Sequence, residues 1–198
     1  MSAPDLTTTL LNAQSPDLAT RQAAESALQS AEQTNLADFC IALATELATE
    51  GKDVNARQLA GLQLKNLLVA KDDALQTEKH SRWKALPPEQ RAVIKSTAVS
   101  AIRSPEQRAR HTSAQACAEI ATIELPFKEW PEFLTLLMEN VTAPNVEDGV
   151  KISSLECLGF TCERIAAVSD IPEIAPDTTD LMLTTIVDGI RPDRPDEI

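Results

Sequence analysis

The chain has 198 residues, of which 43% are hydrophobic and 24% charged, so an intrinsically disordered protein is excluded and one sizeable core or an extended array is possible. Its net charge of −12 argues against nucleic acid as a partner, because phosphate contacts need clustered Lys and Arg, and favours basic partners, although solubility alone would also explain it. The chain has no signal peptide pattern and no apolar run of about 18 residues, which predicts a soluble, intracellular protein with no membrane partner.

Helix signals follow one another along the chain, separated by short gaps. The first opens at Ser15-Pro16-Asp17 and runs toward residue 33, since Pro is favoured in a first helical turn. The others are expected at residues 36–50, 55–71, 87–104, 105–125, 146–167 and 177–190, with one more starting at residues 130–131. The weakest segment, residues 72–88, is expected to hold a short extra helix at 78–84. No alternating strand pattern of useful length is present, so the chain is predicted to be all-α.

Four of these helices share a local phrase, a basic residue followed by small residues and then an apolar one. It occurs as "TRQAAESAL" (20–28), "ARQLAGLQL" (56–64), "ARHTSAQAC" (109–117) and "VKISSLECL" (150–158). The basic residues Arg21, Arg57, Arg110 and Lys151 are 36, 53 and 41 residues apart. These separations bracket the period of HEAT and armadillo repeats, about 40 to 47 residues.

The repeats predict an α-solenoid of HEAT type, each repeat pairing an outer A helix with an inner B helix. Four complete helical hairpins are expected, with the first helix of a fifth, in one array over residues 1–198 that winds as a right-handed superhelix. The repeats are placed roughly at residues 1–33, 35–72, 87–125, 129–168 and, for the start of the fifth, 176–191. Because the fifth helix lacks its partner, we expect the N-terminal piece of a longer protein whose open end favours self-association.

Residues able to support catalysis or bind metal are not gathered in any recognisable pattern. The four cysteines have no CxxC spacing and lie in apolar helical runs, typical of reduced core residues: Cys40, Cys117, Cys157 and Cys162. The two histidines, His80 and His111, have no nucleophile or ligand at useful spacing, and phosphate-binding and nucleophile motifs are missing. The sequence therefore predicts no enzyme, no cofactor and no metal site.

The predicted helix at residues 55–71 carries Leu62 and Val69 around Lys65 on the side opposite its core stripe. The corresponding positions of the four B helices are Gln22, Ser26, Gln29 and Gln33; Gln58, Leu62, Lys65 and Val69; His111, Gln115, Ala118 and Thr122; and, less clearly, Glu156, Phe160, Glu163 and Arg164. Amide groups, a few charges and isolated apolar residues are typical of a protein-binding surface. A contact of Leu62 and Val69 with the neighbouring B helix would explain the pattern equally well.

Longer stretches are more specific. The blocks are "RQLAGLQLKNLLVAKD" (57–72), "RWKALPPEQRAVIK" (82–95), "ACAEIATIELPFKEWPEFLTLLMENVT" (116–142) and "SLECLGFTCERI" (154–165). Together they resemble the N-terminal HEAT repeats of the importin β family, the karyopherin β nuclear import receptors. The resemblance covers nearly the whole chain, with the blocks in the same order and at matching spacing.

The resemblance implies a transport function. Importin β carries cargo through nuclear pores, often by way of importin α, and the GTP form of Ran binds its N-terminal repeats on the concave B-helix side and releases the cargo. By alignment, the two lysines of the family block that contact Ran fall on Lys65 and Lys71. Lys65 also lies on the B-helix face described above, whereas Lys71 turns toward the core side and depends on where its helix ends. Face geometry alone adds Gln58, Leu62, Val69, Gln115 and Glu156.

The resemblance also implies binding of Phe-Gly (FG) repeats of nucleoporins between outer A helices. Leu183 and Val187 fall at matching positions on the fifth A helix, but the other half of that site would lie in a sixth repeat, and the pair could equally be core uncovered by truncation. The surface for importin α or basic cargo lies in later repeats that are missing here. The expected location is the cytoplasm and nucleus, at pores of the nuclear envelope.

Two alternative functions are also consistent with the sequence. A HEAT-repeat scaffold subunit, as in a phosphatase, would have more uniform repeats, without the long insert between Arg57 and Arg110. Another karyopherin, such as an export receptor, would bind Ran cooperatively with cargo.

Overall fold

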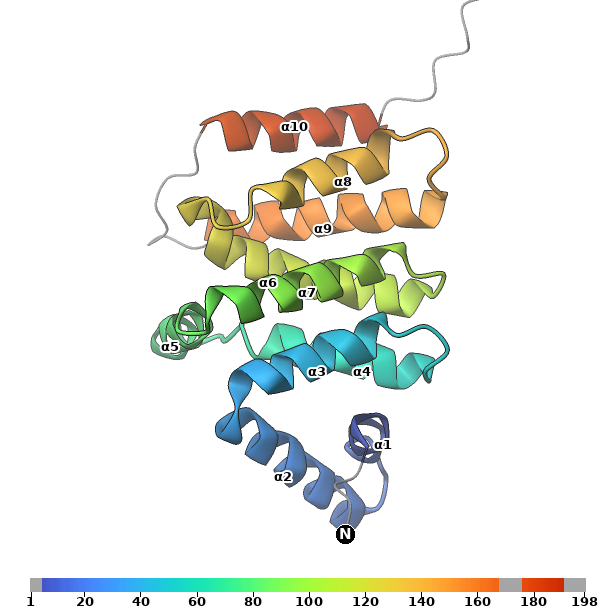
Figure 1. Cartoon of the computed structure of the whole chain (residues 1–198), viewed down its shortest axis with the longest axis vertical. Coiled ribbons are helices and arrows are strands. Elements are labelled where there is room, and N and C mark those ends of the chain that lie inside the picture. Colours follow the sequence, from blue (N-terminus) through green and yellow to red (C-terminus); the bar gives the residue numbers. More distant parts are fainter. Residues whose placement is uncertain (1–4, 168–175, 191–198) are drawn as a thin grey trace, which may run out of the picture. The chain divides into compact units, whose positions relative to one another are not determined.

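The computed structural model describes residues 5–167 and 176–190, which belong to two compact units, Met1–Cys117 and Ala118–Ile198. Within these described ranges the regular structure is entirely helical, as predicted (Figure 1). The expected repeat boundaries at residues 1, 168 and 191 lie outside the described residues, and the division into repeats stays a prediction.

The first unit is built from short helices joined by tight turns. They are α1 (Leu6–Asn12), α2 (Leu18–Thr34), α3 (Leu36–Ala48), α4 (Val54–Asn66), α5 (Asp73–Lys84), α6 (Pro88–Ser100), the 3₁₀ turn η1 (Ala101–Arg103) and the first part of α7 (Gln107–Glu124). The helix α3 packs against both α4 and α6. Its buried side chains are mostly apolar, and Leu43, Ala44 and Leu47 are fully buried. The core of this unit therefore lies around α3.

The first hairpin consists of α1 and α2, which pack against each other. The short helix α1 packs against α4, and α2 packs against α3. Gln22, Ser26, Gln29 and Gln33 of α2 are exposed, as expected for residues opposite the core stripe of that helix.

An acidic residue precedes each of the four repeated basic residues by four positions. The pairs are Asp17 with Arg21, Asp53 with Arg57, Glu106 with Arg110, and Glu147 with Lys151. In every pair the backbone N–H of the basic residue donates to the carbonyl of the acidic one, at 3.0–3.2 Å. The side chains of Asp17 and Asp53 also accept free N–H groups of the first turn, so the acid begins the helix.

Three of the four repeated basic side chains, those of the arginines, bind carbonyls of the segment that precedes their helix. Arg21 donates to the Ser15 carbonyl at 2.9 Å, and Arg110 donates to the Ser104 and Pro105 carbonyls at 2.8 Å. Arg57 is only 1% exposed and donates to the Leu47 carbonyl. For the three arginines the repetition thus has a structural cause, because carbonyls ahead of each helix need donors.

The second unit contains the remainder of α7, the 3₁₀ turn η2 (Leu125–Phe127), α8 (Glu132–Thr142), α9 (Asp148–Ala167) and α10 (Pro176–Ile190). The helix α8 packs against both α9 and α10. Buried Asn140 donates to the Ser154 hydroxyl at 3.0 Å, which joins α8 to α9 through satisfied polar groups.

Each predicted helix is present, with two changes of length. The helix α4 ends at Asn66 and not at residue 71, and α5 begins at Asp73 and not at residue 78. The side chain of Asp72 begins α5 by accepting the N–H of Leu75 at 3.0 Å. A six-residue loop, 67–72, therefore separates α4 from α5.

Candidate protein-binding site

Five of the seven residues predicted to bind Ran lie on α4 and the loop that follows it. One face of α4 is packed into the core through Ala56, Ala60 and Leu64, each 0% exposed. On its other side Gln58, Leu62 and Lys65 are half-buried, as are Val69 and Gln115. The second face of α4 is therefore partly accessible to a partner.

The helices α4 and α7 approach each other very closely. A Cβ atom added to Gly61 would lie 2.5 Å from the Thr112 hydroxyl oxygen. At the start of the same two helices, Arg108 donates to the Asn55 side-chain oxygen at 2.7 Å. Both helices therefore run in the same direction, and Gln115 lies one helical turn beyond the contact with Gly61.

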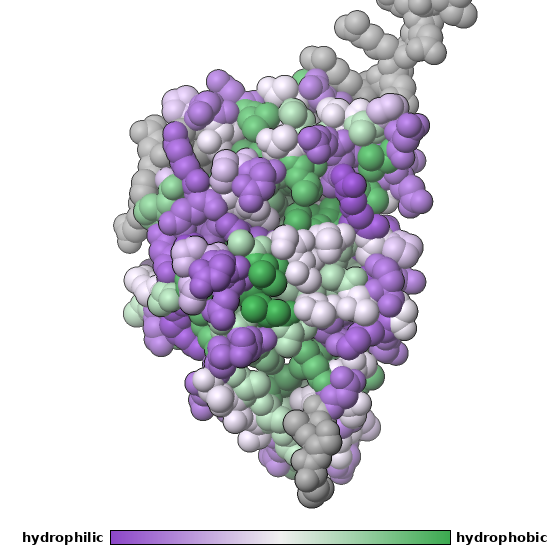
Figure 2. Space-filling model, viewed as in Figure 1, coloured by the Kyte–Doolittle hydropathy of each residue, from purple (hydrophilic) through white to green (hydrophobic). Residues whose placement is uncertain are grey.

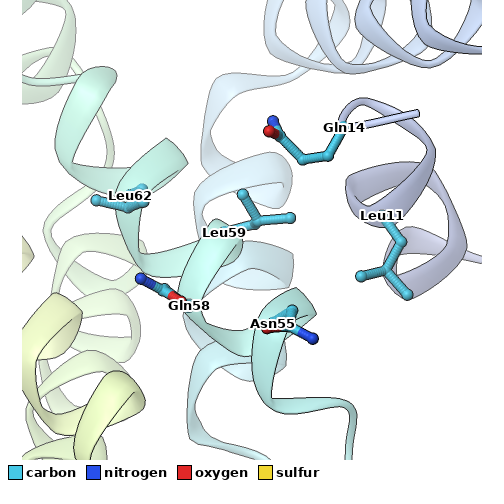
Figure 3. A pocket seen from close by; sticks show the side chains of 6 residues that line it. All are labelled: Leu11, Gln14, Asn55, Gln58, Leu59 and Leu62. Atoms are coloured by element: carbon cyan, nitrogen blue, oxygen red, sulfur yellow. The ribbon is translucent and has the colours of Figure 1, made fainter. Parts of the chain in front are cut away.

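A groove of about 400 Å³ opens between α1 and α4 (Figure 3). Its lining consists of Leu11, Gln14, Asn55, Gln58, Leu59 and Leu62. In Figure 3, Leu59 lies between the two helices, and Leu11 and Gln14 approach from the side of α1. Two of the predicted residues, Gln58 and Leu62, thus line a neutral groove made of leucines and side-chain amides.

The predicted lysines differ in their settings. Lys65 lies in the last turn of α4 and is half-buried, whereas Lys71 is exposed in the loop after the helix. Because α4 ends at Asn66, the helical angle that turned Lys71 toward the core does not apply to it. Both cations therefore lie on the part of the unit formed by the end of α4 and its loop.

Part of the predicted face on α7 is wrong. Ala118 and Thr122 are 1% and 2% exposed, and the Thr122 hydroxyl donates to the Ala118 carbonyl within the helix. From Thr112 to Leu125 every residue except Gln115 is buried. Short Ala, Ser and Thr side chains let neighbouring helices pack closely on more than one side of α7, so this helix has no free stripe.

The other predicted residues lie in the second unit. Glu156 is half-buried on α9. Leu183 and Val187 are 56% and 48% exposed on α10, one turn apart, while Met182 and Thr185 are buried on its opposite side. A Cβ on Gly189 would lie 2.6 Å from Val141, so α10 is closely packed on α8 by the face that does not carry Leu183 and Val187.

Burial and pairing with an arginine account for the shifted pKa values of two thiols and one carboxyl. Burial raises the pKa of the Cys40 and Cys117 thiols to about 12, so these thiols are not nucleophiles at neutral pH. Two hydrogen bonds from the Arg57 guanidinium, 2.8 and 2.9 Å long, hold the pKa of the Glu50 carboxyl below its ordinary value. Among the described residues, no cluster of His, Cys, Asp and Glu has the geometry of a metal site, and no helix is long and apolar enough to span a bilayer.

Figure 2 shows a mixed surface over α2 and α3, with pale and green side chains lying between purple ones. The accessible side of α4 is mixed as well, because it combines Lys65 with side-chain amides and leucines. Such a surface can bind a folded protein that offers carboxylates and a few apolar side chains.

Sequence reasoning missed several residues of this region. Leu11, Gln14 and Leu59 line the groove because α1 packs on α4, which no local pattern reveals. Gln76 and Lys79 of α5 hold the loop that carries Lys71, and the only signal was the unexplained insert in which they lie.

Comparisons with known proteins agree with this arrangement. Residues 24–104 match the model of the importin-beta N-terminal domain. The chain is 37% identical to importin subunit beta-1 of Arabidopsis thaliana over 189 residues, which is 96% of the chain and 21% of that relative. It is 34% identical to importin subunit beta-1 of Schizosaccharomyces pombe over 92% of the chain and 20% of the relative. The chain spans about one fifth of the length of these curated relatives.

Solved structures give the same result for the fold. Yeast importin-beta (Kap95p) superimposes with a TM-score of 0.89 and 32% identity over 100% of the chain and 23% of that protein. A Kap95:Nup1 complex matches with a TM-score of 0.85 and 30% identity over 100% and 23% of the two chains. Kap95p bound to RanGDP, whose switch loops adopt the GTP-bound conformation, matches with a TM-score of 0.79 and 29% identity over 96% and 24%. The predicted α-solenoid class is confirmed.

Proposed function

The chain belongs to the importin β family, and we propose that it acts as the N-terminal segment of a nuclear transport receptor that binds Ran in its GTP form. The observation that carries this proposal is the second face of α4, where Lys65 is on the same helix as a surface of amides and leucines and Lys71 is exposed in the loop that follows. Binding of RanGTP there would control the release of cargo from later repeats.

The chemistry of the face supports a protein partner with an acidic patch. The whole chain has a net charge of −12, but this region presents two cations, Lys65 in the last turn of α4 and Lys71 in the loop after it. Opposite charges across an interface accelerate encounter and fix its register, and desolvated leucines next to them supply affinity. The structure of Kap95p with Ran concerns a protein of the same family and fold, which makes Ran the partner of choice.

Nucleoporins are the second partner we propose. The exposed pair Leu183 and Val187 on α10 offers apolar surface of the kind that receives a Phe side chain. The complex of Kap95 with Nup1 is a precedent within the family. Only one wall of such a site lies in this chain, so the contribution is partial.

The proposal places the receptor in the cytoplasm and nucleus and at nuclear pores. Importin α or basic cargo would bind to later repeats, which are outside this chain. The segment has a regulatory and not a catalytic role, and no cofactor is involved.

Binding of the 198-residue chain to Ran, loaded with a non-hydrolysable GTP analogue or with GDP, tests the proposal by calorimetry. Selective binding of the GTP form is the expected result. A folded chain that binds neither form would favour a scaffold subunit. Selective binding that strengthens when an export cargo is added would favour an export receptor.

A further inference from the structure

The loop between α4 and α5 (residues 67–72) is held by two side chains of α5. Lys79 donates to the carbonyl of Asn66 and, at 2.9 Å, to the carbonyl of Val69. Gln76 donates to the Leu68 carbonyl at 2.8 Å and accepts the N–H of Ala70 at 2.6 Å. Two residues of α5 thus bind three backbone groups of the loop and the carbonyl of Asn66, the last residue of α4.

One of these bonds satisfies the Asn66 carbonyl at the end of α4. The last carbonyls of a helix have no partner within it, and a cation placed there is favoured by the helix dipole. Lys79 supplies both the donors and the charge. The side-chain amide of Gln76 pairs with one donor and one acceptor of the loop, as a neighbouring strand would.

The helix α5 is itself fixed to the unit, so that it can hold the loop. Its Trp83 is 1% exposed, and Arg82 forms an ion pair with Glu32 of α2 at 2.9 Å. The far end of the loop is fixed as well, because the Asp72 side chain begins α5. Lys71 is therefore an exposed side chain on a backbone that is fixed on both sides.

We propose that the α5 insert is a clamp that orients Lys71 for its partner, with Gln76 and Lys79 as positioning residues. The inference rests on the proposed function, in which Lys71 contacts RanGTP. A loop that is ordered before binding loses less conformational entropy on association than a mobile one, so the clamp increases affinity without touching the partner.

A double-mutant cycle tests the clamp, with the 198-residue chain and Ran loaded with the GTP analogue. Gln76→Ala removes both bonds of this side chain to the loop, together with its contact with His80 within α5, and does not change the net charge. We expect it to weaken binding about fivefold, the effect of about one net hydrogen bond. In a Lys71→Ala background the same substitution should have almost no effect, because the oriented group is absent. Lys79→Met should behave in the same way.

Thr77→Ala is the matched control, since its hydroxyl bonds only the Asp73 carbonyl within α5. It should leave the affinity unchanged in both backgrounds. Hydrogen exchange of the Ala70 amide in the loop gives a readout that does not need Ran, and Gln76→Ala should accelerate it at least tenfold while the amides of α4 are unaffected.

The outcomes separate the two proposals. If the unsubstituted chain binds RanGTP but the effects of Gln76→Ala and Lys71→Ala simply multiply, the positioning role is wrong and the proposed function stands. If the unsubstituted chain does not bind RanGTP, the proposed function fails and the orientation of Lys71 for Ran fails with it. Unchanged exchange at Ala70 would overturn the clamp in either case.

Discussion

Gly61 of α4 faces Thr112 of α7 so closely that an added Cβ would lie 2.5 Å from the Thr112 hydroxyl oxygen and 2.6 Å from its Cβ. Rotation of Thr112 cannot relieve the second contact, because its Cβ is fixed to the backbone of α7. The close approach of the two helices thus depends on the absence of a side chain at one position of α4.

Gly61→Ala should therefore destabilise the chain. We expect the free energy of unfolding to fall by about 2 kcal/mol, since the two helices must move apart. Gly159→Ala is the control, because a Cβ there meets no atom within 4 Å, and it should raise stability by about 0.5–1 kcal/mol. Urea unfolding followed by circular dichroism measures both, and equal effects of the two substitutions would contradict the packing described here.

Charge reversal on α4 should weaken binding of RanGTP. Lys65→Glu and Lys71→Glu each place a carboxylate where we expect a cation to meet an acidic partner, and each should reduce the affinity about tenfold. The salt dependence of the affinity should also become weaker. Lys128→Glu, at an exposed position of the second unit, makes the same change in net charge and should leave the affinity unchanged. RanGTP binding that is insensitive to both α4 reversals would move the site elsewhere.

The Glu50 carboxylate should stabilise the fold at neutral pH. Glu50→Gln should lower the free energy of unfolding by about 1 kcal/mol, a modest value because the Glu50 side chain is 52% exposed. The folded pKa of Glu50 lies below the ordinary 4.5, so its contribution is complete above pH 4.5 and is lost as the pH falls through the folded value.

The difference between the two proteins should accordingly be constant near pH 7 and shrink below pH 4.5 in urea titrations. Glu25→Gln, on the exposed surface of α2, removes one carboxylate and serves as the control. A difference that grew on acidification would show that the sign is wrong.

Leu183 and Val187 should matter for binding and not for folding. The double substitution Leu183→Ser and Val187→Ser should weaken binding of an FG-repeat peptide and suppress self-association in sedimentation at high concentration, while the melting temperature changes little. Met182→Ala, on the buried side of the same helix, should cost about 2–3 kcal/mol of stability. If the serine variant melts much lower, the pair is part of the core.

The buried thiols should report on unfolding. Because burial raises the pKa of Cys40 and Cys117 to about 12, almost no thiolate exists at pH 8 and a disulfide reagent cannot reach either sulfur in the folded chain. Their reaction rates should therefore rise with urea in parallel with global unfolding. Half-buried Cys162 should react earlier. Rapid labelling of Cys40 in the native chain would contradict its packing.

Local rules predicted most of the helices. Prolines, acidic caps and glycines act within a few residues, so the positions of α2, α3, α6 and α7 followed from the sequence within a few residues. The repeated basic residues were visible too, although their role in holding turn carbonyls was not. On the candidate site, Lys65 could be placed because α4 is a regular helix as far as Asn66.

The sequence by itself determined the all-α class, the helix order and the family, because these depend on periodicity, caps and continuous blocks of similarity. Only the tertiary structure decided that α1 packs beside α4, that Ala118 and Thr122 are buried, and that α4 ends at Asn66. Each of these depends on groups distant along the chain. The Asn66 carbonyl at the end of α4 is satisfied by Lys79, thirteen residues further along the chain, and a periodic pattern carries no information about such a partner.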